Sequence, residues 1–122
     1  MDQVHIGVIG VGGIARNYHL PPVHALPNAK LVAVCDLDES LLQQAREQFG
    51  FEDAYTDYRR ILDRDDIHAI MLLTRVNTHT EIIPSALEAG KQVFTQKPFA
   101  STVEDAEMMA QVAHRTGNRL VC

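Results

Sequence analysis

The chain has 122 residues, of which 46% are hydrophobic and 22% are charged, and its formal net charge is -5. This length and composition are typical of one folded domain and lack the signature of a disordered chain. The acidic balance offers no basic surface to a phosphate backbone, so we expect no nucleic-acid partner. No apolar run approaches the roughly 20 residues of a membrane span, so we also expect no membrane partner.

The two cysteines, Cys35 and Cys122, lie outside any CxxC or Cys/His cluster. The sequence therefore predicts neither a structural zinc site nor a redox pair, and we expect no metal. The first residues lack the basic start and the long apolar stretch of a signal peptide. We expect a reduced, cytoplasmic protein.

Short apolar segments alternate with amphipathic segments along the chain, as strands alternate with helices. Strands are expected at residues 4–9, 29–36, 54–55, 69–73, 92–98 and 118–122. Helices are expected from residue 13 onward and at 39–50, 58–62, 78–91 and 103–115. Pro21 and Pro22 should shorten or break the first helix, because proline lacks an N–H and clashes with the preceding turn. The alternation predicts an α/β fold, a doubly wound parallel (Rossmann) sheet of about six strands with helices on both faces.

The first turn, at residues 10–15, reads GVGGIA and matches G-x-G-x-x-A between a strand and a helix. Gly10 permits the tight bend, and Gly12 lets the backbone approach a pyrophosphate. The amides of Gly13 and Ile14 then point from the helix N-terminus at the anion. The turn indicates a dinucleotide site, although the same pattern also serves only to pack a strand tightly against a helix.

Asp36 ends the second predicted strand, where a carboxylate accepts hydrogen bonds from the adenosine ribose hydroxyls. The alternative is that Asp36 only caps the next helix; we assign that capping role to Asp38. Leu37 offers no donor to a 2'-phosphate. The sequence therefore favours NAD over NADP.

Two loops, residues 74–81 and 95–99, directly follow predicted strands and so face one crevice. The second loop contains Lys97 beside Pro98. A lysine at the mouth of a cofactor cleft donates a hydrogen bond or acts as an acid or base. An exposed loop lysine without such a role is the commonest state of the residue. The residues alone leave these two interpretations open.

The segments GVIGVGGIA, AVCD and ALEAGKQVFTQKPFA, with the T-x-x-x-x-H spacing of Thr74 and His79, resemble the Gfo/Idh/MocA oxidoreductase family over the whole chain. The resemblance implies that a nicotinamide dinucleotide lies across this domain. It also implies that Lys97 is catalytic and lies near the nicotinamide and the substrate hydroxyl. Gln96 stands where the family has glutamate, which removes a negative charge beside Lys97.

The resemblance adds three residues of the first loop to the expected cofactor site, beside Gln96 and Lys97. They are Thr74, Arg75 and His79. Arg75 replaces the usual proline. Its side chain either contacts a cofactor phosphate or contacts only solvent. His79 resembles a residue that positions the loop, since a lone histidine at a helix start more often bonds locally than catalyses.

The family continues beyond its sixth strand into a larger substrate domain, whereas this chain stops at Cys122. We therefore expect residues 1–122 to be an isolated NAD(P)-binding domain of a dehydrogenase, inactive by itself. The reaction implied for the parent is hydride transfer between NAD(P) and a sugar, inositol or related polyol. We also expect the protein to be a homo-oligomer.

Two alternatives remain open at the level of the sequence. The first is a non-catalytic module that senses NAD(P), because a fold alone does not fix a function. The presence of Lys97 and Pro98 argues against a sensing module, since a sensor needs no acid or base beside the nicotinamide. The second is a CoA-binding Rossmann domain, against which Asp36 argues because it is placed for ribose hydroxyls.

Overall fold

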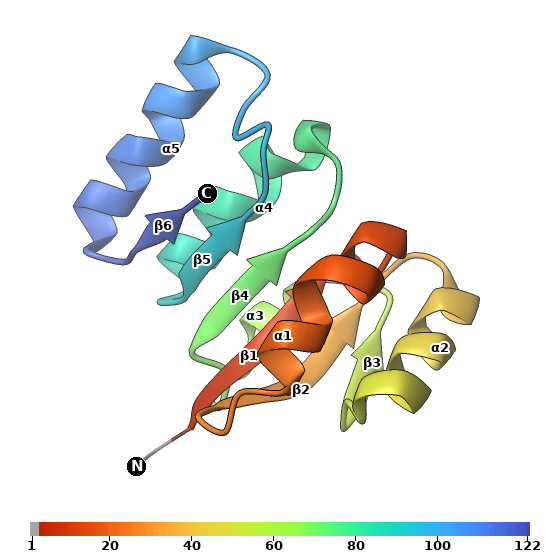
Figure 1. Ribbon diagram of the computed structural model, residues 1–122. Helices are drawn as coiled ribbons and strands as arrows, with labels where there is room; N and C mark the ends of the chain where they lie inside the picture. The colour runs from red at the N-terminus through yellow and green to blue at the C-terminus, as the bar shows by residue number, and fades with distance from the viewer. Residues whose placement is uncertain (1–2) are drawn as a thin grey trace.

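The computed structural model describes residues 3–122, which form one six-stranded parallel sheet covered by helices (Figure 1). The strands are β1 (Val4–Ile9), β2 (Ala29–Cys35), β3 (Asp53–Tyr55), β4 (Ala69–Leu72), β5 (Gln92–Thr95) and β6 (Leu120–Val121). The helices are η1 (Ala15–His19), α1 (Leu20–His24), α2 (Glu39–Phe49), α3 (Arg59–Leu62), η2 (Val76–Thr78), α4 (His79–Glu88) and α5 (Val103–Thr116). The order β3-β2-β1-β4-β5-β6, with every pair parallel, confirms the predicted Rossmann fold.

Successive residues of the central strands point into two separate cores. On one face, Val8 and Met71 pack with the buried side chains of η1, α1 and α2. On the other face, Ile9 and Ile70 pack with those of α3, α4 and α5. Because both faces are covered, these strands are continuous apolar runs rather than alternating ones.

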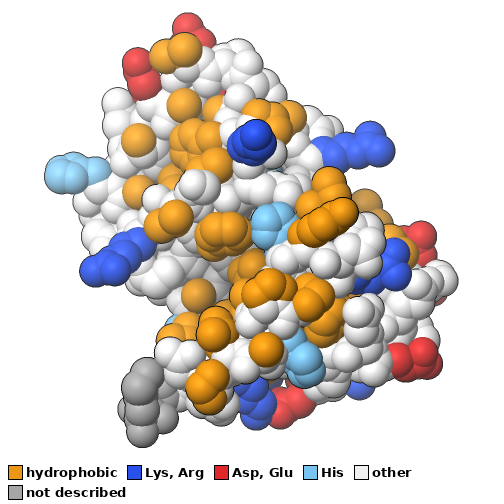
Figure 2. Space-filling model, viewed as in Figure 1, with side chains coloured by type: hydrophobic (Ala, Val, Ile, Leu, Met, Phe, Trp, Pro, Cys, Tyr) orange, Lys and Arg blue, Asp and Glu red, His pale blue; other side chains and the backbone are white. Residues whose placement is uncertain are grey.

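Among residues 3–122, no helix covers the β5 and β6 part of one face of the sheet. In Figure 1, α1 and α2 lie on the β1–β3 half, whereas α4 lies behind β5 and α5 lies beside β6; the buried side chains of α4 and α5 pack on the other face. Phe94 of β5 and Val121 of β6 are consequently 36% and 53% exposed on the α1 side. Apolar side chains gather on this surface in the same view (Figure 2). We call the exposed α1-side surface of β5 and β6 the open face.

The first helix is longer than we expected. Helical backbone runs through residues 13–24, because a π-helical turn accommodates the prolines instead of a break. The N–H of Leu20 donates to the carbonyl of Ala15, five residues back. Pro21 and Pro22 follow this turn directly, as the second and third residues of α1.

The remaining α-helices begin and end within three residues of the expected positions. Asp38 caps α2, since its Oδ1 accepts from the N–H groups of Ser40 and Leu41 at 2.9 and 3.2 Å. Gly50 ends the same helix with a φ of 73°. The helix expected despite Pro84 also forms, as α4.

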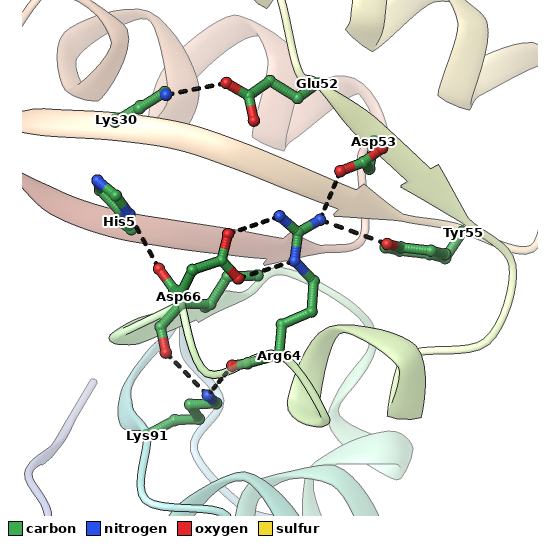
Figure 3. A network of polar contacts seen from close by, with 9 residues as sticks. His5, Lys30, Glu52, Asp53, Tyr55, Arg64, Asp66 and Lys91 are labelled. Atoms are coloured by element: carbon green, nitrogen blue, oxygen red, sulfur yellow. Dashed lines mark hydrogen bonds and ion pairs between the residues drawn. The ribbon is translucent and has the colours of Figure 1, made fainter.

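A polar network closes the end of the sheet at which the strands begin (Figure 3). Arg64 donates to Asp66 at 2.7 Å and to Asp53 at 2.6 Å, and its hydrogen bond lowers the pKa of Asp66 to about 2. The buried Lys91 donates to the carbonyls of Arg64 and Ile67 at 2.5 and 2.8 Å. These bonds hold the connection between α3 and β4 in place, far from the glycine turn.

Two further observations concern the described residues as a group. Within residues 3–122, no cluster of three His, Cys, Asp or Glu side chains is placed to hold a metal ion. No helix in the same range is long and apolar enough to cross a membrane.

Candidate functional site

A cavity of about 520 Å³ opens where β1, β2 and β4 end. It brings together three residues that the sequence predicts for the cofactor site, namely Gly10, Asp36 and Thr74. Its other lining residues are Ile9, Cys35, Leu37, Thr56, Asp57, Tyr58, Arg59, Thr78, Glu81 and Ile82. Ligands of open parallel sheets bind at this edge, outside the carboxyl ends of the strands.

Gly10 and Gly12, both in the first turn, differ in whether the surrounding structure requires glycine. Gly10 has a φ of 96°, and a Cβ there would lie 2.8 Å from Thr74 Cγ2. Only glycine therefore lets the end of β1 pass so close to the end of β4. At Gly12, by contrast, a Cβ would meet no atom within 4 Å. The protein's own packing does not require glycine at that position, which leaves an open cradle beside the helix start.

Gly13 and Ile14 begin the first helix and are both exposed. The first N–H groups of a helix have no intrahelical partner, and the helix dipole adds positive potential at this end. The cradle at Gly12 lies next to these amides. An anion such as a pyrophosphate fits this combination of open space and donors.

The Asp36 carboxylate is fixed by two backbone donors. Its Oδ2 accepts from the N–H of Val11 and its Oδ1 from the N–H of Asp38, both at 2.9 Å. A carboxylate has about four acceptor sites, so these two bonds leave others free for hydroxyl donors. The carboxylate thus joins the glycine turn to the start of α2 and faces the cavity.

Residues 56–59, which follow β3, form a further wall of the cavity, and our sequence reasoning missed them. Burial raises the pKa of Tyr58. Arg59 donates to Asp57 at 3.0 Å, and this bond lowers the pKa of the Asp57 carboxyl. The rule that parallel strands end at one edge could have found this segment, because it follows a predicted strand.

Thr74 and Thr78 form a pair at the end of β4. Their hydroxyl oxygens are 2.6 Å apart. Thr78 donates its proton to the carbonyl of Arg75 at 2.7 Å, so Thr74 is the donor between the two hydroxyls. The Arg75 side chain is exposed and does not line the cavity.

His79 is only 1% exposed and lies below the site rather than in its lining. Its Nδ1 is 2.8 Å from the carbonyl of Phe99, and its Nε2 is 3.3 Å from Thr95 Oγ1. A carbonyl can only accept, so Nδ1 carries a proton. His79 therefore ties the start of α4 to β5 and to the loop that carries Lys97.

Gln96 and Lys97 follow β5, on the other side of β1 from Asp36. Lys97 is exposed, and the peptide bond that joins it to Pro98 is cis. Gln96 is half-buried, and its Oε1 lies 3.1 Å from Nε2 of His19. Neither Gln96 nor Lys97 lines the cavity, so the expected cofactor residues occupy two regions along one edge of the sheet.

Comparison with a family model agrees with this geometry. The Gfo/Idh/MocA model, described as an oxidoreductase family with an NAD-binding Rossmann fold, matches residues 4–122. Levoglucosan dehydrogenase of Pseudarthrobacter phenanthrenivorans is 34% identical over 118 residues, which are 89% of this chain and 30% of that protein. The inositol 2-dehydrogenase/D-chiro-inositol 3-dehydrogenase of Halalkalibacterium halodurans is 33% identical and is matched over 97% of this chain and 34% of its own length. The chain thus spans about a third of the length of these relatives.

Solved structures give the same picture. A 3-ketoreductase from Actinomadura kijaniata, in complex with NADP and TDP-benzene, superimposes with a TM-score of 0.91 at 31% identity. The match covers 98% of this chain and 36% of that one. The apo scyllo-inositol dehydrogenase from Lactobacillus casei has a TM-score of 0.90 at 27% identity, with coverage of 98% and 36%.

Proposed function

Because the chain belongs to the Gfo/Idh/MocA oxidoreductase family, we propose that it is the dinucleotide-binding domain of a dehydrogenase that acts on a sugar, inositol or related polyol. The observation that carries the proposal is the open space at Gly12, in the turn that joins Gly10 of the cavity to the helix amides of Gly13 and Ile14. The substrate class is supported by the levoglucosan and inositol dehydrogenases to which the chain is similar.

In this proposal the dinucleotide lies along the carboxyl edge of the sheet. Its pyrophosphate binds over Gly12 and accepts from the amides of Gly13 and Ile14. Its adenosine occupies the cavity, where the free acceptor sites of Asp36 take the ribose hydroxyls. Thr74 lines the same cavity at the end of β4.

We propose NAD rather than NADP as the preferred cofactor. The Asp36 carboxylate would repel a 2'-phosphate at the ribose that it binds. Leu37, which is 88% exposed at the cavity, offers that phosphate no donor. Arg59 is the nearby cation, and Asp57 already pairs with it at 3.0 Å.

The loop after β5 supplies the proposed chemistry. When bound, the nicotinamide cofactor would accept or donate the hydride. Lys97 exchanges the proton of the substrate hydroxyl, because its exposed ammonium follows β5 at the edge where the cofactor lies. His79 supports this loop from below through Phe99 and Thr95. In this proposal Gln96 faces the cofactor. Arg75 either contacts a cofactor phosphate or contacts only solvent.

The chain covers about a third of its relatives, so we propose that a substrate domain completes the active site. Holding the substrate near the nicotinamide contributes roughly 7–11 kcal/mol of barrier reduction, and in this proposal the substrate domain supplies that positioning. We propose that the protein works as a homo-oligomer in the cytoplasm. Its two free cysteines fit a reducing compartment.

The test uses Gly12→Ala and Gly117→Ala in this chain, with NADH binding measured by calorimetry and stability by thermal unfolding. A Cβ at Gly12 meets nothing within 4 Å, so Gly12→Ala should fold normally and lose NADH binding. Gly117 has a φ of 74° and is also surrounded by open space. Gly117→Ala should therefore lose about 1–2 kcal/mol of stability and keep its NADH affinity. Unchanged NADH affinity in Gly12→Ala would contradict the proposed function.

A further inference from the structure

One side-chain contact joins the first helix to the loop that carries Lys97. Nε2 of His19 lies 3.1 Å from Oε1 of Gln96, across 77 positions of sequence. An amide oxygen only accepts, so His19 Nε2 carries the proton and donates it. The His19 ring also packs edge-on against Phe94, with centroids 6.0 Å apart. Two independent contacts thus hold His19 against β5.

The π-helical turn directs the His19 side chain toward Phe94 and Gln96. His19 is the last residue of η1, in which the N–H of Leu20 donates to the carbonyl of Ala15. The extra residue in the turn rotates the following helix by about 100° relative to a regular α-helix. Such turns are frequent at functional sites. The backbone distortion and the side-chain contact therefore point to one role.

The strand order shows which part of a dinucleotide this contact faces. Asp36 follows β2, the glycine turn follows β1, and Gln96 follows β5, in a sheet ordered β3-β2-β1-β4-β5-β6. A dinucleotide with its adenosine at Asp36 and its pyrophosphate at the glycine turn extends its other half toward β4 and β5. Gln96 consequently lies on the side of the nicotinamide riboside.

We propose that His19 is a positioning residue that holds Gln96 with its amide NH₂ turned toward the nicotinamide riboside half of the cofactor. This inference rests on the proposed function. With Oε1 engaged by His19, the NH₂ group of Gln96 has no hydrogen-bond acceptor among residues 3–122. Gln96 is therefore a donor of fixed direction, suited to an oxygen of the cofactor.

The test compares NADH with ADP, which lacks the nicotinamide riboside, by calorimetry on this chain. His19→Ala, Gln96→Ala and the double variant are measured beside His114→Ala, an exposed histidine of α5. We expect each single variant to lose about fivefold in NADH affinity, a factor appropriate to one hydrogen bond. The double variant should lose no more than either single one, because both remove the same contact. ADP affinity, and both affinities of His114→Ala, should stay unchanged.

Two conservative variants separate positioning from a structural effect. His19→Gln keeps a donor and should retain more NADH affinity than His19→Ala. Gln96→Met keeps most of the length of the side chain but removes both its donor and its acceptor, so it should weaken NADH as much as Gln96→Ala does and leave ADP unchanged. These variants, with thermal unfolding as a check, carry the test if His19→Ala does not fold.

The outcomes distinguish this inference from the proposed function. If the unaltered chain binds neither NADH nor ADP, the proposed function fails and the inference with it. If both ligands bind, but His19→Ala changes neither affinity or lowers both equally, the positioning role is overturned and the proposed function stands. NADH affinity in Gln96→Met equal to that of the unaltered chain would overturn the donor role of Gln96.

Discussion

The Asp36 carboxylate accepts hydrogen bonds from backbone N–H groups, and we propose that it also binds the ribose hydroxyls. An experiment must distinguish these two roles. We expect Asp36→Ala to weaken NADH about 10- to 100-fold, the range for losing hydrogen bonds to a charged group. NADPH should be weakened less, because removing the carboxylate also removes its repulsion of the 2'-phosphate. Titration of both cofactors gives the ratio of their affinities.

Asp38→Ala is the matched control, because Asp38 caps α2 and lies outside the cavity lining. Losing the cap should cost about 0.5–2 kcal/mol of stability and leave the ratio of NADH to NADPH affinity unaltered. Tighter binding of NADPH than of NADH by the unaltered chain would count against the ribose role of Asp36.

Lys91 is a second residue whose environment predicts a measurable effect. It is 5% exposed and donates to two backbone carbonyls, those of Arg64 and Ile67. Lys91→Met keeps most of the side-chain volume but leaves both carbonyls without this donor. We expect a loss of about 1–3 kcal/mol in the free energy of unfolding, measured with urea.

Lys30 provides the comparison for Lys91. Its ion pair with Glu52 joins two side chains that are 42% and 52% exposed. Exposed pairs of this kind contribute at most about 1 kcal/mol, so Lys30→Met should have a small effect. Equal losses for the two variants would show that the buried position of Lys91 is not what matters.

At the scale of elements, the junction of β1 and β4 depends on Gly10. A Cβ there would lie 2.8 Å from Thr74 Cγ2 and 2.9 Å from the Leu73 carbonyl carbon, at a φ of 96°. Gly10→Ala should combine the left-handed penalty with overpacking and lose about 2–5 kcal/mol of stability. Chemical denaturation measures this loss.

Gly50 isolates the conformational part of that penalty. It has a φ of 73° at the end of α2, but a Cβ there meets nothing within 4 Å. Gly50→Ala should lose only about 1–2 kcal/mol. The difference between the two variants is the cost of the overlap that the added methyl group makes with Leu73 and Thr74. If Gly10→Ala were as stable as Gly50→Ala, the close approach would have no energetic consequence.

At the scale of the whole molecule, we expect the open face to promote self-association of the chain. It exposes Phe94 and Val121, while β6 pairs only with β5 and leaves its other edge free within the described sheet. Apolar surface and an unpaired strand edge both favour self-association. We expect light scattering to give a mass above that of one chain, increasing with concentration.

The double variant Phe94→Ser with Val121→Lys is the corresponding control. It should shift the mass toward one chain, because it removes apolar area and places a charge near the edge strand. A mass of one chain at all concentrations for the unaltered protein would contradict the expected association. Thermal unfolding serves as the check that the variant is folded.

The sequence by itself determined the features that depend on neighbouring residues. Apolar runs predict the strands because both faces of a parallel sheet are buried. Asp38 and Gly50 mark the ends of α2 because a cap and a left-handed residue act on the nearest backbone groups. The glycine turn and Asp36 were found for the same reason, since one follows the first strand and the other ends the second.

Only the tertiary structure decided which distant residues meet. The contact between His19 and Gln96 and the open face each depend on the order of strands in the sheet. The π-helical turn also escaped sequence reasoning, because the effect of Pro21 and Pro22 depends on which backbone groups still need a donor. Packing across the sheet fixes these choices, and no spacing along the chain encodes them locally.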